Sequence, residues 1–103
     1  NTKFVKEGFA VIIGPDEEVF DNITASQTAD VLLDVKGVEA SFVIYRRSDS
    51  VVGISARSLG SINVQTIMER LGGGGHLSNA ATQIEDKTTE EVYIQLSEEI
   101  NKE

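Results

Sequence analysis

The chain has 103 residues and a mass of 11.2 kDa, with 40% hydrophobic and 25% charged residues. This size and composition are those of one globular domain with a single core, and they argue against a disordered tail, a collagen-like repeat or a membrane protein. The formal net charge of −8 disfavours binding to long nucleic acid, which rests on many Lys/Arg–phosphate contacts.

The counts of individual residue types exclude several chemistries. There is no Cys, so disulfides, cysteine zinc sites and thiol nucleophiles are absent, and the single His excludes metal sites built on several imidazoles. The longest apolar run, residues 9–13, is five residues long, against the roughly 20 that a spanning helix needs. Because the chain starts with Asn1 rather than Met, we expect it to be part of a longer protein whose remainder could hold the chemistry.

The first part of the chain predicts a strand, a turn and a helix. Residues 9–13 are rich in aromatic and β-branched types, which favour a buried strand, and Pro15 within Gly-Pro-Asp predicts a turn. The acidic residues that follow, 16–18 and 21, are interpreted as a solvated loop. Thr24 and Gln27 match a capping box, so we predict a helix that starts at Thr24 and ends after Lys36, before Gly37.

The middle of the chain predicts an antiparallel hairpin. In residues 40–47 and in residues 51–57 alternate side chains fall into two sets, as they do on the two faces of a strand. Residues 48–50 form a short polar connection between these segments. We interpret Arg46 and Arg47, which lie beside this connection, as solvated charges.

The last part of the chain predicts two capped helices. Asn63 can cap a helix that continues to Leu71, and Thr88 with Glu91 forms a capping box for a final helix. Between them, residues 76–81 are compatible with a short helix and residues 82–85 with a strand. The whole chain, residues 1–103, is therefore predicted to be one small α+β domain, a mixed β-sheet with helices packed on it.

Residues 72–76 read Gly-Gly-Gly-Gly-His, a run that core packing does not explain. Each glycine loses more backbone entropy on folding than any other residue and adds no side chain to a core. One interpretation is a flexible linker. The other is an anion-binding loop, because a Gly-rich segment leading into a helix start exposes backbone N–H groups to phosphate, and His76 adds a donor that titrates near neutral pH.

A second candidate feature is the pair Arg57-Ser58 at the end of a predicted strand. Arg offers a planar fork of donors that matches phosphate oxygens, and Ser offers a hydroxyl. Taken alone, an Arg at a strand end is most often a solvated surface residue. The functional interpretation depends on this pair and the Gly-His run flanking one helix, residues 63–71.

These segments together resemble the DHHA1 domain, the substrate-binding domain attached to DHH-type phosphoesterases. The resemblance is carried by residues 56–64, Ala-Arg-Ser-Leu-Gly-Ser-Ile-Asn-Val, and by residues 72–81, Gly-Gly-Gly-Gly-His-Leu-Ser-Asn-Ala-Ala. The run of residues 79–83 is most similar to the membrane-anchored cyclic-di-AMP phosphodiesterases of Gram-positive bacteria. Many relatives end the motif in Ala-Ala-Gly, whereas this chain has Thr82, which argues against the oligoribonuclease and exonuclease branches.

The resemblance implies that a nucleotide, cyclic di-AMP or a short linear dinucleotide, is held here and hydrolysed with metal ions of a DHH domain. Manganese is the expected metal there, whereas no cofactor or metal site is expected in this chain, which lacks an Asp-His-His sequence. The implied parent is a membrane-anchored enzyme, with this domain in the cytoplasm, free of membrane contact, and with a homodimer among its expected assemblies. Carried over by position, substrate-binding roles fall on Arg57, Ser58, Gly73, Gly74, Gly75, His76 and Asn79.

Two alternative functions remain open at this point. The first is a nucleic-acid-binding module, as in oligoribonucleases, single-strand exonucleases or the C-terminal region of alanyl-tRNA synthetases. The charge of −8 and the absence of Trp disfavour it, because long strands need basic grooves and stacking platforms. The second is a purely structural dimerisation domain, which leaves the four glycines unexplained.

Overall fold

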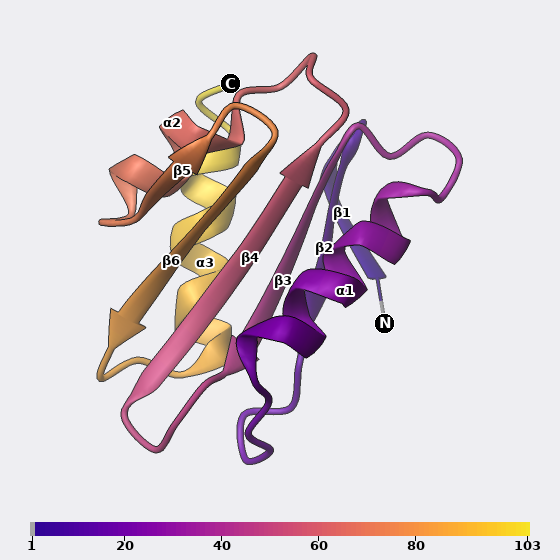
Figure 1. Ribbon diagram of the computed structural model, residues 1–103. Helices are drawn as coiled ribbons and strands as arrows, with labels where there is room; N and C mark the ends of the chain where they lie inside the picture. Colours follow the sequence, from indigo (N-terminus) through magenta and orange to yellow (C-terminus); the bar gives the residue numbers. More distant parts are fainter. Residues whose placement is uncertain (1) are drawn as a thin grey trace.

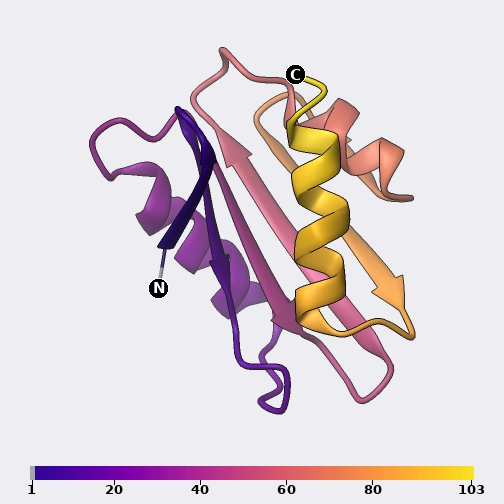
Figure 2. The same ribbon diagram turned by 180° about the vertical axis from the view of Figure 1, so that it is seen from behind.

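The computed structural model describes residues 2–103, and these form one six-stranded sheet with helices on both faces. The strand order is β1-β2-β3-β4-β6-β5, and every neighbouring pair is antiparallel except β2 and β3. Helix α1 lies on one face, and α2 and α3 lie on the other (Figures 1 and 2). The predicted α+β class is confirmed. The elements are β1 Thr2–Lys6, β2 Phe9–Ile13, α1 Asn22–Leu33, β3 Ala40–Arg46, β4 Val51–Ser58, α2 Val64–Arg70, β5 Gly74–His76, β6 Asn79–Glu85 and α3 Thr89–Ile100.

The main hydrophobic core lies between the sheet and the two helices α2 and α3. It is built around fully buried side chains of the central strands, such as Phe42 and Ile54, and of the helices, such as Met68 and Leu96. The core under α1 is thinner, because small residues such as Ala25 and Ala29 bring that helix close to the sheet. Burial of apolar surface on both faces fixes the register of the strands.

The predicted start and end of the first helix are wrong. The N-cap is Asp21, whose carboxylate accepts a hydrogen bond from the Thr24 backbone N–H at 2.7 Å, so Thr24 lies inside α1. An Asp three residues earlier is at least as good a cap as a Thr, which is why the capping-box pattern at Thr24 misleads. The helix ends at Leu33, three residues before Lys36.

Strand β1 has no counterpart among the predicted elements. It pairs only with β2 and is largely exposed, and its sequence, Thr-Lys-Phe-Val-Lys, carries a charge on either side of its two apolar residues. Lys is common on edge strands, where it discourages pairing with other chains. The hydrophobic pattern that reveals buried strands is therefore weak here.

The hairpin of β3 and β4 is confirmed, but Arg46 is not a solvated charge. It is buried, and its guanidinium donates to the Asp16 carboxylate at 2.6 Å and to backbone carbonyls of residues 48, 49 and 87. Asp16 also accepts from the Thr89 backbone N–H at 2.9 Å. The acidic loop that begins at Asp16, which the sequence predicted to be solvated, thus connects the hairpin to the start of α3.

The N-caps predicted for the last two helices are confirmed, whereas the prediction of a short helix at residues 76–81 is wrong. Asn63 caps α2, and Thr88 and Glu91 form the capping box of α3. Residues 74–76 instead form β5, which folds back on β6 through the two residues Leu77 and Ser78. Strand β6 begins at Asn79 rather than at residue 82, because residues 79–81 pair with both β5 and β4.

Candidate functional site

Three of the predicted site residues form one row across the sheet. Arg57 of β4 is the Cα partner of Asn79 of β6, and Asn79 is in turn the partner of His76 of β5. Residues directly opposite each other in antiparallel strands project to the same face of a sheet. Arg57 contacts Asp30 of α1, so this row lies on the α1 face.

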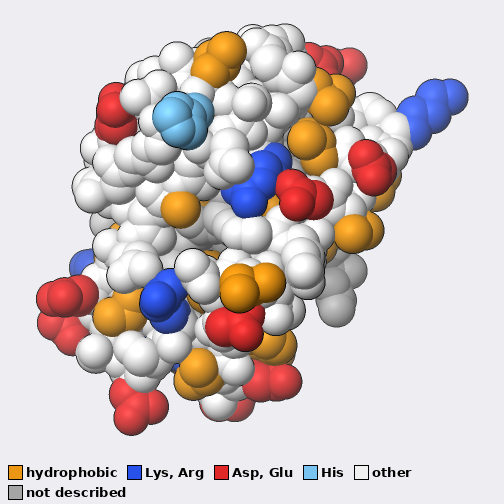
Figure 3. Space-filling view, viewed as in Figure 1, with side chains coloured by type: hydrophobic (Ala, Val, Ile, Leu, Met, Phe, Trp, Pro, Cys, Tyr) orange, Lys and Arg blue, Asp and Glu red, His pale blue; other side chains and the backbone are white. Residues whose placement is uncertain are grey.

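Helix α1 covers only part of that face. It packs over β3 and one side of β4, and the strip formed by β4, β6 and β5 beside it has no helix on it (Figure 1). In the space-filling view the His side chain is fully on the surface of this strip, surrounded mainly by uncharged groups (Figure 3). The His76 and Asn79 end of the row is thus accessible from solvent.

The guanidinium of Arg57 is held in a fixed orientation. Nε donates to the Asp30 carboxylate at 3.0 Å and Nη1 donates to the Ala56 carbonyl at 2.9 Å. The Arg57 side chain is 13% exposed, whereas that of Asp30 is 62% exposed. These bonds use Nε and Nη1 and leave Nη2 for a further acceptor. Because the guanidinium is already oriented before a ligand arrives, Nη2 can donate a charge-assisted hydrogen bond to an anion.

The next row of the strip is made of small residues. Ser55 of β4 is paired with Ala81 of β6, and Ala81 with Gly74 of β5. By the same rule these residues share the face of Arg57 and His76. A ligand or a second domain can therefore approach the sheet closely beside the polar row.

Three of the four consecutive glycines are explained by the chain's own structure. Gly72 and Gly75 have φ angles of +88° and +145°, which L side chains rarely adopt. A Cβ on Gly73 would lie 2.1 Å from the Ala81 carbonyl oxygen, so this glycine lets the loop pack against β6. The flexible-linker interpretation is wrong for these positions, because the run ends a helix and begins a paired strand.

Gly74 is the exception among the four. Its φ angle lies outside the left-handed region, and a Cβ built on it would meet nothing within 4 Å. Neither backbone strain nor packing within residues 2–103 requires a glycine at this position. The position is therefore the one at which close approach from outside the chain would account for the missing side chain.

Ser58 is not brought together with Arg57. It pairs with the buried Ala40, so its side chain lies on the opposite face of the sheet. Its hydroxyl accepts from the Gly60 backbone N–H at 3.1 Å, and its own N–H donates to the Ser78 carbonyl at 3.0 Å. Ser58 thus connects the end of β4 to the turn between β5 and β6.

The strip continues into a hollow that sequence reasoning missed. About 210 Å³ in volume, it is lined by residues that include Asn22 and Ser26 of α1, Ser55 of β4, and Gln83 of β6. The signal available in the sequence was the two-residue period of a strand, which places Gln83 on the same face as Asn79 once the strand is extended back to residue 79.

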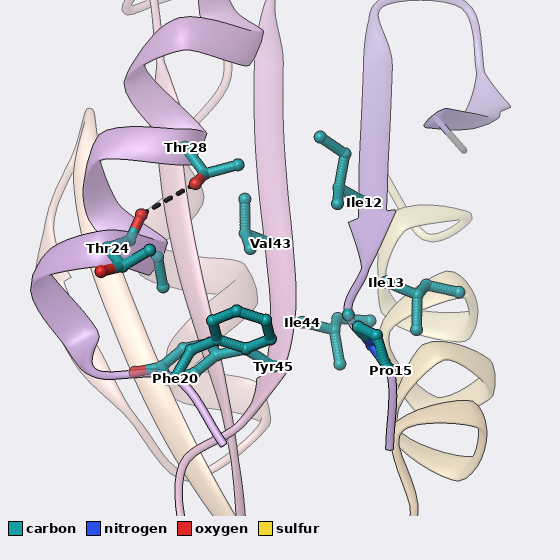
Figure 4. A pocket seen from close by; sticks show the side chains of 11 residues that line it. Ile12, Ile13, Pro15, Phe20, Thr24, Thr28, Val43, Ile44 and Tyr45 are labelled. Carbon is teal, nitrogen blue, oxygen red and sulfur yellow. Dashed lines mark hydrogen bonds between the residues drawn. The ribbon is translucent and has the colours of Figure 1, made fainter. Parts of the chain in front are cut away.

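A separate apolar hollow of about 230 Å³ lies between α1 and the ends of β2 and β3. Figure 4 shows Ile12, Val43 and the rings of Phe20 and Tyr45 around it, with the Thr28 hydroxyl donating to the Thr24 carbonyl. No charged side chain lines it. It therefore lacks the groups that would bind a phosphate.

Within residues 2–103 there is no group of three or more His, Asp or Glu side chains that could hold a metal ion. The described chain also has no helix with the length and apolar character required to cross a membrane. The donor set of the row, one guanidinium, one imidazole and one amide, fits an anion rather than a cation.

Comparison with known proteins gives close relatives over most of the chain. The model of the DHHA1 domain family matches residues 6–103. The chain is 57% identical over 96 residues to the cyclic-di-AMP phosphodiesterase GdpP of Geobacillus thermodenitrificans, and 58% identical over 90 residues to the cyclic-di-AMP phosphodiesterase PdeA of Listeria monocytogenes. These alignments cover 93% and 87% of this chain but only 15% and 14% of the relatives.

Two solved structures share the fold at lower identity. The C-Ala domain of Aquifex aeolicus alanyl-tRNA synthetase has a TM-score of 0.71 and 18% identity, with 96% of each chain covered. A pGpG-specific phosphodiesterase of Vibrio cholerae has a TM-score of 0.64 and 15% identity, with 97% of this chain and 35% of that chain covered. Both likenesses concern the fold alone.

Proposed function

The chain belongs to the DHHA1 domain family, and from that premise we propose that it is the substrate-holding domain of a phosphodiesterase that hydrolyses cyclic di-AMP to a linear dinucleotide. The two relatives that match it at 57% and 58% identity are both cyclic-di-AMP phosphodiesterases. This chain spans about one seventh of their length, so the rest of such an enzyme lies outside it.

The observation that carries the proposal is the position of Gly74 beside the polar row. The open space above Gly74 lies on the same face as three donors in the next row of the strip, the guanidinium of Arg57, the amide of Asn79 and the imidazole of His76. Strand β5 is at the edge of the sheet, so one side of its backbone is unpaired. A phosphodiester above Gly74 would meet side-chain donors and backbone N–H groups together.

In this proposal the chain binds and orients the nucleotide, and another domain performs the hydrolysis. A DHH domain of the same protein would hold the metal ions, manganese by resemblance, that activate the attacking water. Arg57 and His76 would hold the phosphodiester against that domain, and the absence of a side chain at Gly74 would leave room for the phosphodiester. The membrane anchor and a homodimer of the whole protein belong to the same proposal.

A nucleic-acid-binding function has less support. The likeness to the synthetase C-Ala domain is one of fold, at 18% identity. A long strand requires a basic track, whereas the net charge is −8 and the row holds a single guanidinium. A short ligand with one or two phosphates suits this row better.

The experiment compares the longer protein with its His76→Ala variant. We expect kcat/KM for cyclic di-AMP to fall about tenfold or more, because a contact to phosphate worth ~1.4 kcal/mol is lost. The chain alone, incubated with manganese and cyclic di-AMP, should leave the nucleotide intact. Unchanged kinetics of the His76→Ala variant, with the fold verified by circular dichroism, would remove His76 from the site.

A further inference from the structure

The polar hollow is continuous with the row of donors. Its floor includes Ser55, one wall is Asn22 and Ser26 of α1, and the other side is Gln83 of β6. Ser55 and Ser26 are joined by a hydroxyl–hydroxyl hydrogen bond of 3.1 Å, which fixes the helix wall against the floor. The same strip thus has a guanidinium and an imidazole at one end, and at the other a hollow lined mainly by uncharged groups, with Arg47 as its one charged side chain.

The geometry of β6 relates the two ends. Asn79, Ala81 and Gln83 occupy alternate positions of one strand, so their side chains share a face. The Cα atoms of Asn79 and Gln83 are about 14 Å apart at roughly 3.4 Å per residue. Between them lies only the methyl group of Ala81, so an extended nucleotide with its phosphate at Arg57 can lie along the strip with its base in the hollow.

The chemistry of the hollow suits a purine base. Asn22 and Gln83 are exposed and present amides, each with a donor and an acceptor. Such amides pair in bidentate fashion with the N6 and N7 atoms of adenine, whereas guanine is read chiefly by Arg or Lys. Arg47 also lines the hollow, but it borders a second hollow that it lines together with Asp21, so a carboxylate lies in the surroundings of its charge.

We propose that the hollow is the base subsite of the bound nucleotide, and that the amides of Gln83 and Asn22 recognise the edge of an adenine. This inference rests on the proposed function, since it presumes a phosphodiester at the Arg57 row. It assigns selectivity for the base to β6 and α1, and binding of the phosphate to β4 and β5.

The test measures kcat/KM of the longer protein on three substrates: cyclic di-AMP, cyclic di-GMP and bis(p-nitrophenyl) phosphate, a phosphodiester without a purine. For Gln83→Ala we expect kcat/KM to fall about tenfold on cyclic di-AMP, less on cyclic di-GMP, and little on the purine-free substrate. A tenfold loss lies in the lower half of the discrimination that a bidentate amide–adenine pair provides. Gln83→Glu, which keeps the size of the side chain but lacks the N–H₂ donor, should behave in the same way. Gln27→Ala, a change of an exposed glutamine of α1 outside the hollow, is the matched control and should be silent.

The outcomes separate this inference from the function on which it rests. Arg57→Ala should reduce turnover of all three substrates, because it removes a phosphate contact. If Arg57→Ala is impaired but both Gln83 variants keep the selectivity of the native enzyme, or lose all three substrates equally, the base subsite is refuted and the proposed function stands. If Arg57→Ala is unimpaired on every substrate, the proposed function itself fails.

Discussion

Arg57 and Asn79 face each other across the pair β4–β6, with both side chains on the face that α1 leaves partly uncovered. They are 22 positions apart in the sequence, and the helix α2 lies between them in the chain but on the other side of the sheet. The two motifs that flank α2 therefore meet because β6 returns alongside β4. This pairing is what turns two separate sequence signals into one surface.

Arg57→Ala in the longer protein should weaken substrate use far more than folding. A charge-assisted contact to phosphate is worth roughly 1.5–3 kcal/mol, so kcat/KM for cyclic di-AMP should fall about 10- to 150-fold. The lost pair with the exposed Asp30 should change the free energy of unfolding by less than about 1 kcal/mol. Steady-state kinetics and thermal unfolding of the same preparation measure both. A large drop in Tm with native kinetics would make Arg57 a structural residue.

Gly73→Ala should destabilise the chain whatever the protein binds. The added Cβ would lie 2.1 Å from a carbonyl oxygen and 2.5 Å from the Thr82 Cβ, neither of which can move without shifting β6. We expect a loss of about 1–3 kcal/mol in the free energy of unfolding, measured by denaturant titration. A Gly73→Ala variant as stable as the native chain would show that this loop does not pack on β6 as described.

The carboxylate of Asp16 should make stability depend on pH. The Thr89 backbone N–H, and after it the Arg46 guanidinium, lower the pKa of Asp16 below 3.8. A group whose pKa is lower in the folded state stabilises above its unfolded pKa, and that contribution is lost as the pH falls through the folded pKa. Asp16→Asn should therefore lower Tm at pH 7, and the gap to the native chain should narrow below about pH 4. A gap of constant size at pH 7 and pH 3 would contradict this role.

The sequence identifies elements where one local signal dominates and misses them where tertiary contacts decide. Asn63 and Thr88 lie where the helix caps are expected, because a cap is a local contact within four residues. Strand β5 was missed because its three residues carry two glycines, and only pairing with β6 makes them a strand. The burial of Arg46 depends on Asp16 and Lys87, which are 30 and 41 positions away and leave no trace in local spacing.

For the candidate site, too, the sequence identifies the residues but not the arrangement that tertiary contacts decide. The residue types and their motifs point to Arg57, His76 and Asn79, and the structure places these three in one row. The motif treats Ser58 as equivalent to its neighbour, whereas strand alternation sends its side chain to the other face. The motif also treats all glycines alike, and only the backbone angles and neighbouring atoms separate Gly74 from the other three.

The claim that a ligand or domain approaches the sheet at Gly74 is tested most directly by measuring stability and kcat/KM of the Gly74→Ala variant. We expect the two quantities to respond differently. In the chain itself the methyl group enters open space, so the free energy of unfolding should be unchanged or raised by up to about 1 kcal/mol. In the longer protein the same methyl group would occupy the place of the phosphodiester or of the domain that closes on it, and kcat/KM for cyclic di-AMP should fall at least about tenfold. A stable Gly74→Ala variant with full activity would contradict the account, since nothing would then approach the strip at the one glycine that the fold does not require.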